Sequence, residues 1–291
     1  MTNLHLFIGC VAIWGSTWLA IKFQLGTVAP EASVTYRFFL ASLLIFGYCF
    51  SRKLPLKYPW REHAWLAFLG VLMFSVSYIL VYYAEEHVVS GLVAVGYSAS
   101  PLLGMLGMRM FFGTPMTRRL AVASLLGIVG IALVFWPEFS RLGSDRNTVL
   151  GAIYTALAVV VSTLGSMVAH RNQQVHLPLW QSLAWGMLYG AIFSALVTVF
   201  GGKSFTFEFT PAYVISLLYL TILGSIIAFA GFLTLLKRIG AARSGYIGVM
   251  VPIVALVISA AFEAFQWHPL TVVGIAISVL GNIVILREKR A

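Results

Sequence analysis

The chain has 291 residues, of which 60% are hydrophobic and 10% are charged, with a formal net charge of +10 and a mean hydropathy of +0.93. A water-soluble domain is about half apolar and about a quarter charged, so this composition excludes a soluble fold and makes lipid the solvent. The Lys and Arg residues gather in alternate loops and not on one face, which excludes nucleic acid as a partner.

Ten apolar segments follow one another along the chain, each close to the ~20 residues with which an α-helix crosses a membrane. They cover residues 4–24, 31–51, 64–83, 88–110, 120–136, 148–170, 177–200, 212–236, 241–263 and 269–286. No Lys or Arg precedes the first segment, which is therefore interpreted as a retained span and not as a cleaved signal peptide. The sequence predicts an all-α membrane protein with ten transmembrane helices.

Charged residues in the loops predict how these segments are oriented. The C-terminal end of the chain and every second loop carry most of the Lys and Arg residues, among them Arg52, Lys53 and Arg171. The other loops hold few bases and most of the acids. Because cytoplasmic loops are enriched in Lys and Arg, both termini are predicted to lie in the cytoplasm.

The second half of the chain repeats the hydrophobic pattern of the first half after a shift of 151 residues. Pro101 then falls on Pro252, while the acidic pair at 85–86 stands where the second half carries the basic pair at 237–238. Matching turns of opposite charge lie on opposite faces of a membrane. Five spans per half is an odd number, so we predict two inverted five-helix repeats, a construction typical of transporters.

A polar stretch at 138–147 separates the two halves, and its Gly143, Ser144 and Asp145 are residues typical of turns and linkers. We interpret 1–137 as the first five-helix repeat, 138–147 as an extracytoplasmic linker and 148–291 as the second, inverted repeat. A separate five-helix half would expose its polar inner face to lipid. The two repeats are therefore expected to form one intertwined bundle.

Acids and metal ligands are scarce inside the predicted segments. No Asp or Glu lies near the middle of a segment, because Glu263 is at the outer end of the ninth segment and Glu85 and Glu86 are placed in a turn. Proton-coupled and ion-coupled carriers usually keep a carboxylate at mid-depth, so uniport or exchange is favoured over tight proton coupling. The scattered His and Cys residues lack metal-site spacing, so no metal, cofactor or catalytic residue is predicted.

Aromatic and hydroxyl side chains lie deep in several segments. Trp14 is near the midplane, where its indole N–H needs a partner, and it shares a helix face with Trp18. Two interpretations remain open: a core tryptophan bonded to a neighbouring carbonyl or hydroxyl, or the wall of a substrate cavity. Each hydroxyl also suits an ordinary contact between helices. The candidate substrate-binding residues are Trp14, Ser16, Thr17, Trp18, Tyr78, Tyr82, Tyr97, Ser98, Ser162, Phe229, Tyr246 and Met250.

Three further residues have two interpretations each. Arg37 lies about 9 Å along the second segment from Glu31. It either binds a substrate carboxylate or is a structural charge that extends outward or pairs with an outer acid. Pro101 and Pro252 each remove a backbone hydrogen bond at matching places of the fourth and ninth segments. They are interpreted as flexing points of a gate or as static kinks.

Small residues align in the fifth and tenth segments, where Gly130 matches Gly281 and Ala123 matches Gly274. Such residues let helix backbones approach closely. The pattern predicts close helix packing in these two segments, which is interpreted as a packing signal or a dimer face and not as a substrate site. The chain is accordingly expected to be a monomer or a weak homodimer.

The first half carries Trp14-Gly15-Ser16, Lys22 and Arg37-Phe38, and the second half carries Gly240 to Tyr246, Pro252 and Glu263. With these residues the chain resembles the drug/metabolite transporter superfamily, and in particular its EamA-type ten-helix exporters, over essentially its whole length. The resemblance implies that segments one, three, four, six, eight and nine line a central cavity, with five and ten at the periphery. It also implies export of amino acids or similar amphiphilic metabolites across the bacterial inner membrane. The aromatic candidates make the chain similar to YddG-type aromatic amino acid exporters.

Substrate export by alternating access is thus the predicted function, with a small molecule and the lipid bilayer as partners. Phe112 stands where a counterpart of Glu263 would fall, so the site is expected to be asymmetric. A multidrug or organic-cation exporter is the alternative, but it would need a membrane carboxylate. A membrane-embedded enzyme would need clustered acids, bases or metal ligands, which the sequence does not provide.

Overall fold

The fold was obtained as a computed structural model, which describes residues 2–113, 118–141, 146–244 and 246–286. The described residues form helices and no strand, which confirms the all-α prediction for this part of the chain. Two short segments, η1 and η3, are π-helical, and η2 is a 3₁₀-helix. In chain order the elements are α1 (Asn3–Lys22), α2 (Pro30–Ser51), α3 (Trp60–Val71), η1 (Leu72–Val76), α4 (Ser77–His87), α5 (Ser90–Gly96), η2 (Tyr97–Ala99), α6 (Ser100–Phe112), α7 (Arg118–Arg141), α8 (Arg146–Gln174), α9 (Leu179–Phe200), α10 (Pro211–Tyr219), η3 (Leu220–Ile227), α11 (Ala228–Ser244), α12 (Tyr246–Phe262) and α13 (Pro269–Leu286).

Six helical stretches are long and apolar enough to cross a membrane: Asn3–Lys22, Pro30–Ser51, Trp60–His87, Arg146–Gln174, Leu179–Phe200 and Pro211–Phe232. They coincide with six of the ten predicted segments. Within the described residues the other four predicted segments contain the shorter apolar stretches Ser90–Ala99, Leu125–Pro137, Met250–Phe262 and Pro269–Gly281. The predicted linker is shared between the end of α7 and the start of α8, and its residues 142–145 lie outside the described part of the chain.

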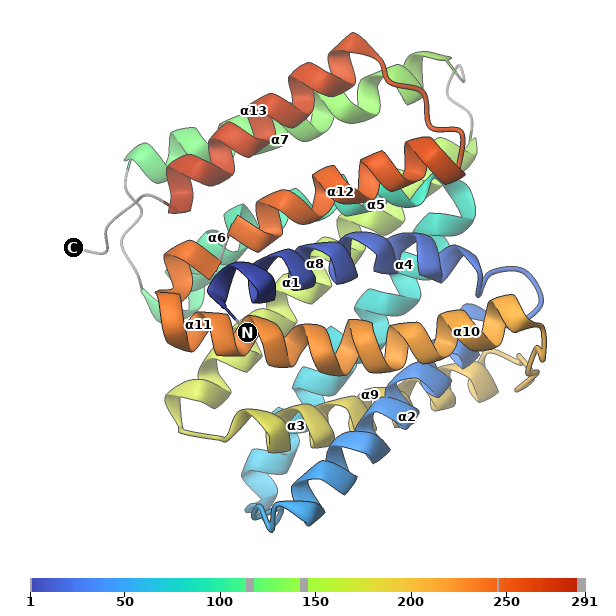
Figure 1. The fold of residues 1–291 in the computed structure, drawn as a ribbon, viewed down its shortest axis with the longest axis vertical. Helices are drawn as coiled ribbons and strands as arrows, with labels where there is room; N and C mark the ends of the chain where they lie inside the picture. The colour runs from blue at the N-terminus through green and yellow to red at the C-terminus, as the bar shows by residue number, and fades with distance from the viewer. Residues whose placement is uncertain (1, 114–117, 142–145, 245, 287–291) are drawn as a thin grey trace.

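The helices are arranged as a central group between two edges (Figure 1). α7 and α13 lie side by side at one edge, and α2, α3 and α9 form the opposite edge. Between them α1 contacts α5, α11 and α12, while α4 contacts α8. The start of α1 and the end of α13 lie at the same end of the bundle (Figure 1). We call this the N-terminal end, and the opposite end, where α1 finishes at Lys22, the Lys22 end.

Side chains are distributed as a lipid solvent requires. Phe38 and Phe74 are buried in the core, whereas Leu43 and Leu44 on α2 and Leu196 on α9 are exposed. A protein in water rarely exposes so many large apolar side chains together. The outer surface of the bundle is therefore suited to contact with acyl chains, in agreement with a multi-pass membrane protein.

The α7–α13 pair packs as the small residues predict. A Cβ atom on Gly130 would lie 2.6 Å from the main-chain oxygen of Gly274, and one on Gly274 would lie 2.6 Å from that of Gly130. The two backbones thus meet directly where neither residue has a side chain. The close packing of these two segments is confirmed as a contact inside one chain.

Two long helices are each interrupted by one π-helical segment. η1 separates α3 from α4, and η3 separates α10 from α11. Adding the shift of 151 residues to Leu72–Val76 gives positions 223 to 227, which fall inside η3. A π-helical turn inserts an extra residue into a helix and is frequent at functional sites. Both interruptions therefore mark corresponding positions in the two halves of the chain.

Glycine also sets the distance between α3 and α9. A Cβ atom on Gly70 would lie 2.3 Å from the oxygen of Gly186 and 2.7 Å from the nitrogen of Gly190. These are backbone atoms and cannot rotate away. The helix that leads into η1 is therefore seated against α9 only because position 70 has no side chain.

We expect Gly70→Ala to destabilise the folded protein by about 1–3 kcal/mol, the usual cost of inserting a methyl group into a filled contact. The matched control is Gly47→Ala on α2, where a Cβ atom meets nothing within 4 Å and where helix propensity favours Ala. Thermal unfolding of the purified variants in detergent checks this. Equal midpoints for the two variants would contradict the close contact.

Candidate functional site

A cavity of about 470 Å³ lies inside the central group of helices. All six segments that the resemblance assigns to the cavity contribute to its lining, and α2 adds Arg37. Among the residues whose side chains are described, α7 and α13 contribute none to the lining. Toward the N-terminal end the lining reaches Ile247 and Gly248 in the first turn of α12. Toward the Lys22 end it finishes at Ile21 and Val81. The lining residues are Trp14, Thr17, Trp18, Ile21, Arg37, Met73, Phe74, Tyr78, Val81, Ala94, Tyr97, Ser100, Ser162, Ser166, Phe229, Phe232, Ile247, Gly248, Val251 and Pro252.

Trp14 forms one wall of the cavity together with two rings of α11. Its indole nitrogen donates to the main-chain oxygen of Gly224 at 3.1 Å. Its ring lies 5.3 Å from that of Phe229 and 5.5 Å from that of Phe232, centroid to centroid. The indole N–H is satisfied by a carbonyl of η3, as the first interpretation expected, and the ring also faces the cavity.

A second group of rings faces this wall from α1, η2 and α4. Trp18 lies 5.2 Å from Tyr97, and Tyr78 lies 4.8 Å from Phe38, measured between ring centroids. Tyr97 belongs to the 3₁₀-helical segment between α5 and α6. Aromatic rings therefore enclose the cavity from both halves of the chain.

Arg37 is the charged residue of the lining, and its side chain is only 2% exposed. Its Nε donates to Ser225 Oγ at 3.2 Å, and its Cζ lies 4.6 Å from the centre of the Tyr78 ring. The Nη1 atom has no hydrogen-bond partner among the described residues. Arg37 does not extend outward to the surface, because α2 buries the side chain and directs it at η3.

Nine of the candidates named from the sequence meet in the cavity: Trp14, Thr17, Trp18, Arg37, Tyr78, Tyr97, Ser162, Phe229 and Pro252. Tyr246 and Pro101 lie outside the residues whose side chains the structure describes. The other candidates do not line the cavity. Ser16 shares a hydrogen bond with Tyr219 at 2.6 Å, Tyr82 donates to Gln24 at 2.5 Å, Ser98 is buried, and Met250 is 38% exposed. Ser16 and Ser98 occupy other helix faces than the lining residues next to them, whereas Tyr82 shares a face with Tyr78 but its hydroxyl donates to Gln24.

Several lining residues were missed from the sequence, and helical spacing could have found some of them. Phe74 precedes Tyr78 by four residues, Ser166 follows Ser162 by four, and Phe232 follows Phe229 by three. Residues three or four apart share a helix face. Met73 and Val251 do not lie three or four residues from a candidate named from the sequence, so helical spacing would not have found them.

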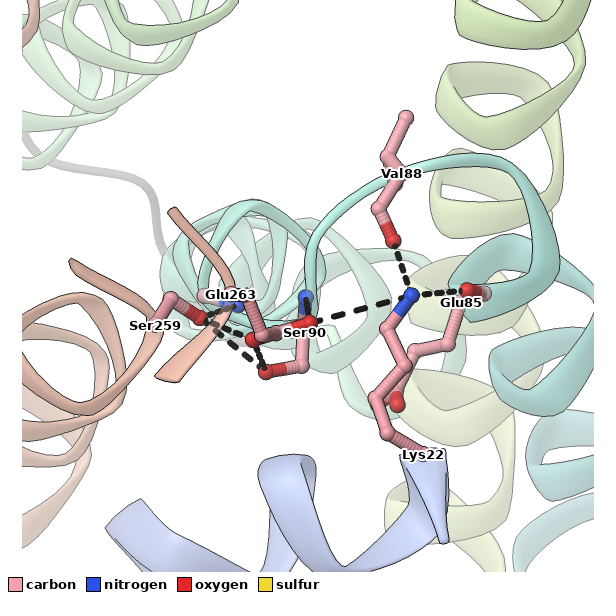
Figure 2. Close-up of polar contacts among 7 residues, drawn as sticks. Lys22, Glu85, Val88, Ser90, Ser259 and Glu263 are labelled. Atoms are coloured by element: carbon pink, nitrogen blue, oxygen red, sulfur yellow. Dashed lines mark hydrogen bonds and ion pairs between the residues drawn. The ribbon is translucent and has the colours of Figure 1, made fainter. Parts of the chain in front are cut away.

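At the end of α1, Lys22 contacts residues at the ends of two other helices (Figure 2). Its ammonium group donates to the main-chain oxygens of Glu85 and Val88, the latter at 3.0 Å. It also lies 3.7 Å from Oε1 of Glu263. One side chain of α1 thus joins the end of α4 to the end of α12.

The carboxylate of Glu263 receives several donors at the same place (Figure 2). The backbone nitrogen of Ser90 donates to Oε1 at 3.1 Å, and the hydroxyls of Ser90 and Ser259 donate to Oε2. The nitrogen of Gly91 in turn donates to Ser259 Oγ at 2.8 Å. We call these residues the Lys22 cluster: Lys22, Glu85, Val88, Ser90, Gly91, Ser259 and Glu263.

Glu85 does not lie in a turn, contrary to the prediction from the sequence. α4 continues to His87, so Glu85 is a helical residue, and it is 0% exposed. Glu86, next to it, is exposed at the surface of the same helix. The bundle therefore does contain a buried carboxyl group near the cavity, which the sequence analysis did not find.

Comparisons with known proteins agree with a transporter. The sequence profile of the EamA-like transporter family matches the chain twice, over residues 2–136 and 149–287. The uncharacterized inner membrane transporter YedA of Escherichia coli strain K12 is 26% identical over 275 residues, covering 91% of this chain and 86% of that protein. The uncharacterized transporter YoaV of Bacillus subtilis strain 168 is 24% identical over 283 residues, covering 94% and 91%.

One solved structure, titled only "Crystal structure of protein", superposes with a TM-score of 0.69 at 17% sequence identity and covers 97% of this chain and 95% of its own. At this identity the likeness shows a shared fold alone. The family profile extends over nearly all of both halves of the chain. On this evidence, and with the multi-pass helical fold described above, the chain belongs to the EamA-like transporter family.

Proposed function

We propose that this protein exports small hydrophobic metabolites that carry a carboxylate, with aromatic and other hydrophobic amino acids as the substrate class. The observation that carries the proposal is the buried guanidinium of Arg37, which faces a ring-lined cavity and whose Nη1 has no hydrogen-bond partner in the described part of the chain. A buried cation without a counter-charge is costly, at several kcal/mol. A substrate carboxylate would supply that counter-charge.

Arginine suits this task because its planar group donates two parallel hydrogen bonds to a carboxylate. Ser225 occupies Nε and thereby fixes the orientation of the group, while Nη1 stays available. The rings of Trp14, Trp18 and Tyr97 would cover the apolar part of the same substrate. The cavity volume also lies within the ~300–1,000 Å³ of small-molecule sites.

We further propose that the chain consists of two inverted five-helix repeats, 1–137 and 148–291, that alternate access to the cavity. Supporting this are the two matches to one family profile and the corresponding positions of η1 and η3. The contacts α2–α9 and α7–α13 also join elements that correspond under the repeat. Both termini would then lie on the cytoplasmic side of a bacterial inner membrane, and so would the N-terminal end of the bundle.

Pro252 remains a candidate gating residue, since it lies inside α12 and lines the cavity.

The alternative, a multidrug or organic-cation exporter, fits the cavity less well. Its lining carries a cation and no carboxylate among the described residues. A cationic substrate would meet repulsion from Arg37 at short range. An anionic or zwitterionic substrate is favoured on the same grounds.

We expect proteoliposomes with the purified protein to transport tryptophan but not tryptamine, which has the same ring system and no carboxylate. Arg37→Met should reduce tryptophan flux about 10- to 100-fold, the effect of losing hydrogen bonds to a charged group worth about 1.5–3 kcal/mol. The control is Arg52→Met, because Arg52 lies exposed after α2. Transport of tryptamine, or full activity of Arg37→Met, would contradict a carboxylate site at Arg37.

We expect Trp14→Ala to lower transport strongly without preventing insertion, because it removes both a cavity wall and the hydrogen bond to Gly224. Truncating a buried aromatic side chain typically costs about 3–5 kcal/mol, so thermal unfolding is measured alongside flux. The control is Trp60→Ala, since Trp60 is 84% exposed. A folded Trp14→Ala protein with normal flux would show that this wall does not contact substrate.

A further inference from the structure

Two buried polar atoms in the lining of the cavity have no hydrogen-bond partner in the part of the chain that the structure describes. They are Nη1 of Arg37 and Oγ of Ser100. Arg37 belongs to α2, which packs against α9 and η3, whereas Ser100 begins α6, which packs against α8 (Figure 1). The carboxylate proposed above gives Arg37 a partner and leaves the hydroxyl of Ser100, on another wall of the same cavity, without one.

The hydroxyl of Ser100 differs from those on the neighbouring helix α8. A hydroxyl inside a helix can donate to the carbonyl of the preceding turn. Thr163 donates to the oxygen of Val159 at 2.7 Å, and Ser166 donates to that of Ser162 at 3.1 Å. The turn before Ser100 is the 3₁₀-helical η2, and the hydroxyl does not bond to an oxygen of that turn. Ser100 therefore offers both a donor and an acceptor to a molecule in the cavity.

The packing of α6 on α8 brings Ser100 close to a second hydroxyl. Two contacts fix the register, because a Cβ atom on Gly96 would lie 2.3 Å from Thr155 and one on Gly107 would lie 3.1 Å from Met167. The partners are 59 residues apart at the first contact and 60 at the second, so the two helices run in the same direction. Ser100 is thus level with positions 159 and 160, less than one helical turn from Ser162.

Tyr97 adds a third hydroxyl to this wall. It lies in η2, directly before α6, and its hydroxyl is within hydrogen-bonding reach of Ser162. All three residues line the cavity. We call Tyr97, Ser100 and Ser162 the hydroxyl subsite.

We propose that the hydroxyl subsite binds a hydrogen-bonding atom on the ring of the substrate. The preferred substrates are then aromatic amino acids whose ring carries such an atom, namely the hydroxyl of tyrosine or the N–H of tryptophan. Phenylalanine and the aliphatic amino acids, which lack it, are transported less well. This rests on the proposed function, in which Arg37 binds the carboxylate, and it adds the group that selects among the amino acids.

The order of tyrosine and phenylalanine reports on this subsite. A cavity lined by rings alone would favour phenylalanine, because the hydroxyl of tyrosine would lose its water without gaining a partner. With the hydroxyl subsite the order is reversed. Phenylalanine leaves Ser100 unpaired, whereas the hydroxyl of tyrosine can donate to it and accept from it. A site built to bond a substrate hydroxyl discriminates strongly against an analogue without one.

The test measures the flux of labelled tyrosine and labelled phenylalanine, at equal concentrations, in proteoliposomes with the purified protein. The wild type should transport tyrosine about 10-fold faster, the effect of leaving one buried hydroxyl unpaired. Ser100→Ala should remove this preference by lowering tyrosine flux and leaving phenylalanine flux unchanged. Ser100→Thr, which retains a hydroxyl, should keep the preference. Thr163→Val is the matched control, because the hydroxyl of Thr163 donates to its own helix.

The possible failures are distinguishable. Wild-type protein that transports phenylalanine as fast as tyrosine, or faster, would overturn the hydroxyl subsite and leave the carboxylate site at Arg37 standing. An unchanged preference in folded Ser100→Ala would also overturn the subsite. The comparison within the wild type needs no variant, so poor folding of Ser100→Ala would not prevent a decision. Absence of flux for every amino acid would overturn the proposed function and the subsite with it.

Discussion

A charge inside a lipid-embedded bundle has to be stabilised by the protein itself, because lipid supplies neither water nor counter-ions. This constraint applies to four charged residues at the cavity and at the Lys22 end: Arg37, Lys22, Glu85 and Glu263. The protein stabilises their charges to different degrees. Lys22 and Glu263 satisfy each other within a network of serines and main-chain atoms. Arg37 is partly satisfied by Ser225, and Glu85 has no partner for its carboxylate among the described residues.

The segment η3 connects two parts of the site that are distant in sequence. Gly224 provides the carbonyl that accepts from Trp14, and its neighbour Ser225 accepts from Arg37. Ser225 in turn donates to the oxygen of Leu220, five residues earlier, as the wider π-helical turn permits. The same local distortion therefore positions the aromatic wall and orients the cation.

The sequence predicted the parts of the fold that depend on long apolar runs, and it failed where a few residues at a helix end decide burial. Arg37 and Trp14 stood out because they lie deep in unambiguous segments, and both line the cavity. Glu85 was misplaced because α4 continues only a few residues beyond the predicted boundary, yet this changes an exposed turn into a buried helix face. Tyr82 was assigned to the cavity because it shares a helix face with Tyr78, whereas its hydroxyl donates to Gln24 and it does not line the cavity. The π-helical turn η1, which no sequence pattern predicted, sets the rotation of α4 relative to α3.

The extra residue of η3 has a consequence for how this family member tolerates change. Each residue of an α-helix adds a rotation of about 100°, so a residue deleted from the regular part of α10 would turn every later side chain by that angle. The wide turn of η3 already holds an extra residue, so a deletion there would restore a regular helix and leave Phe229 and Phe232 directed at the cavity. The place at which this helix gains or loses a residue thus decides whether the cavity keeps its rings.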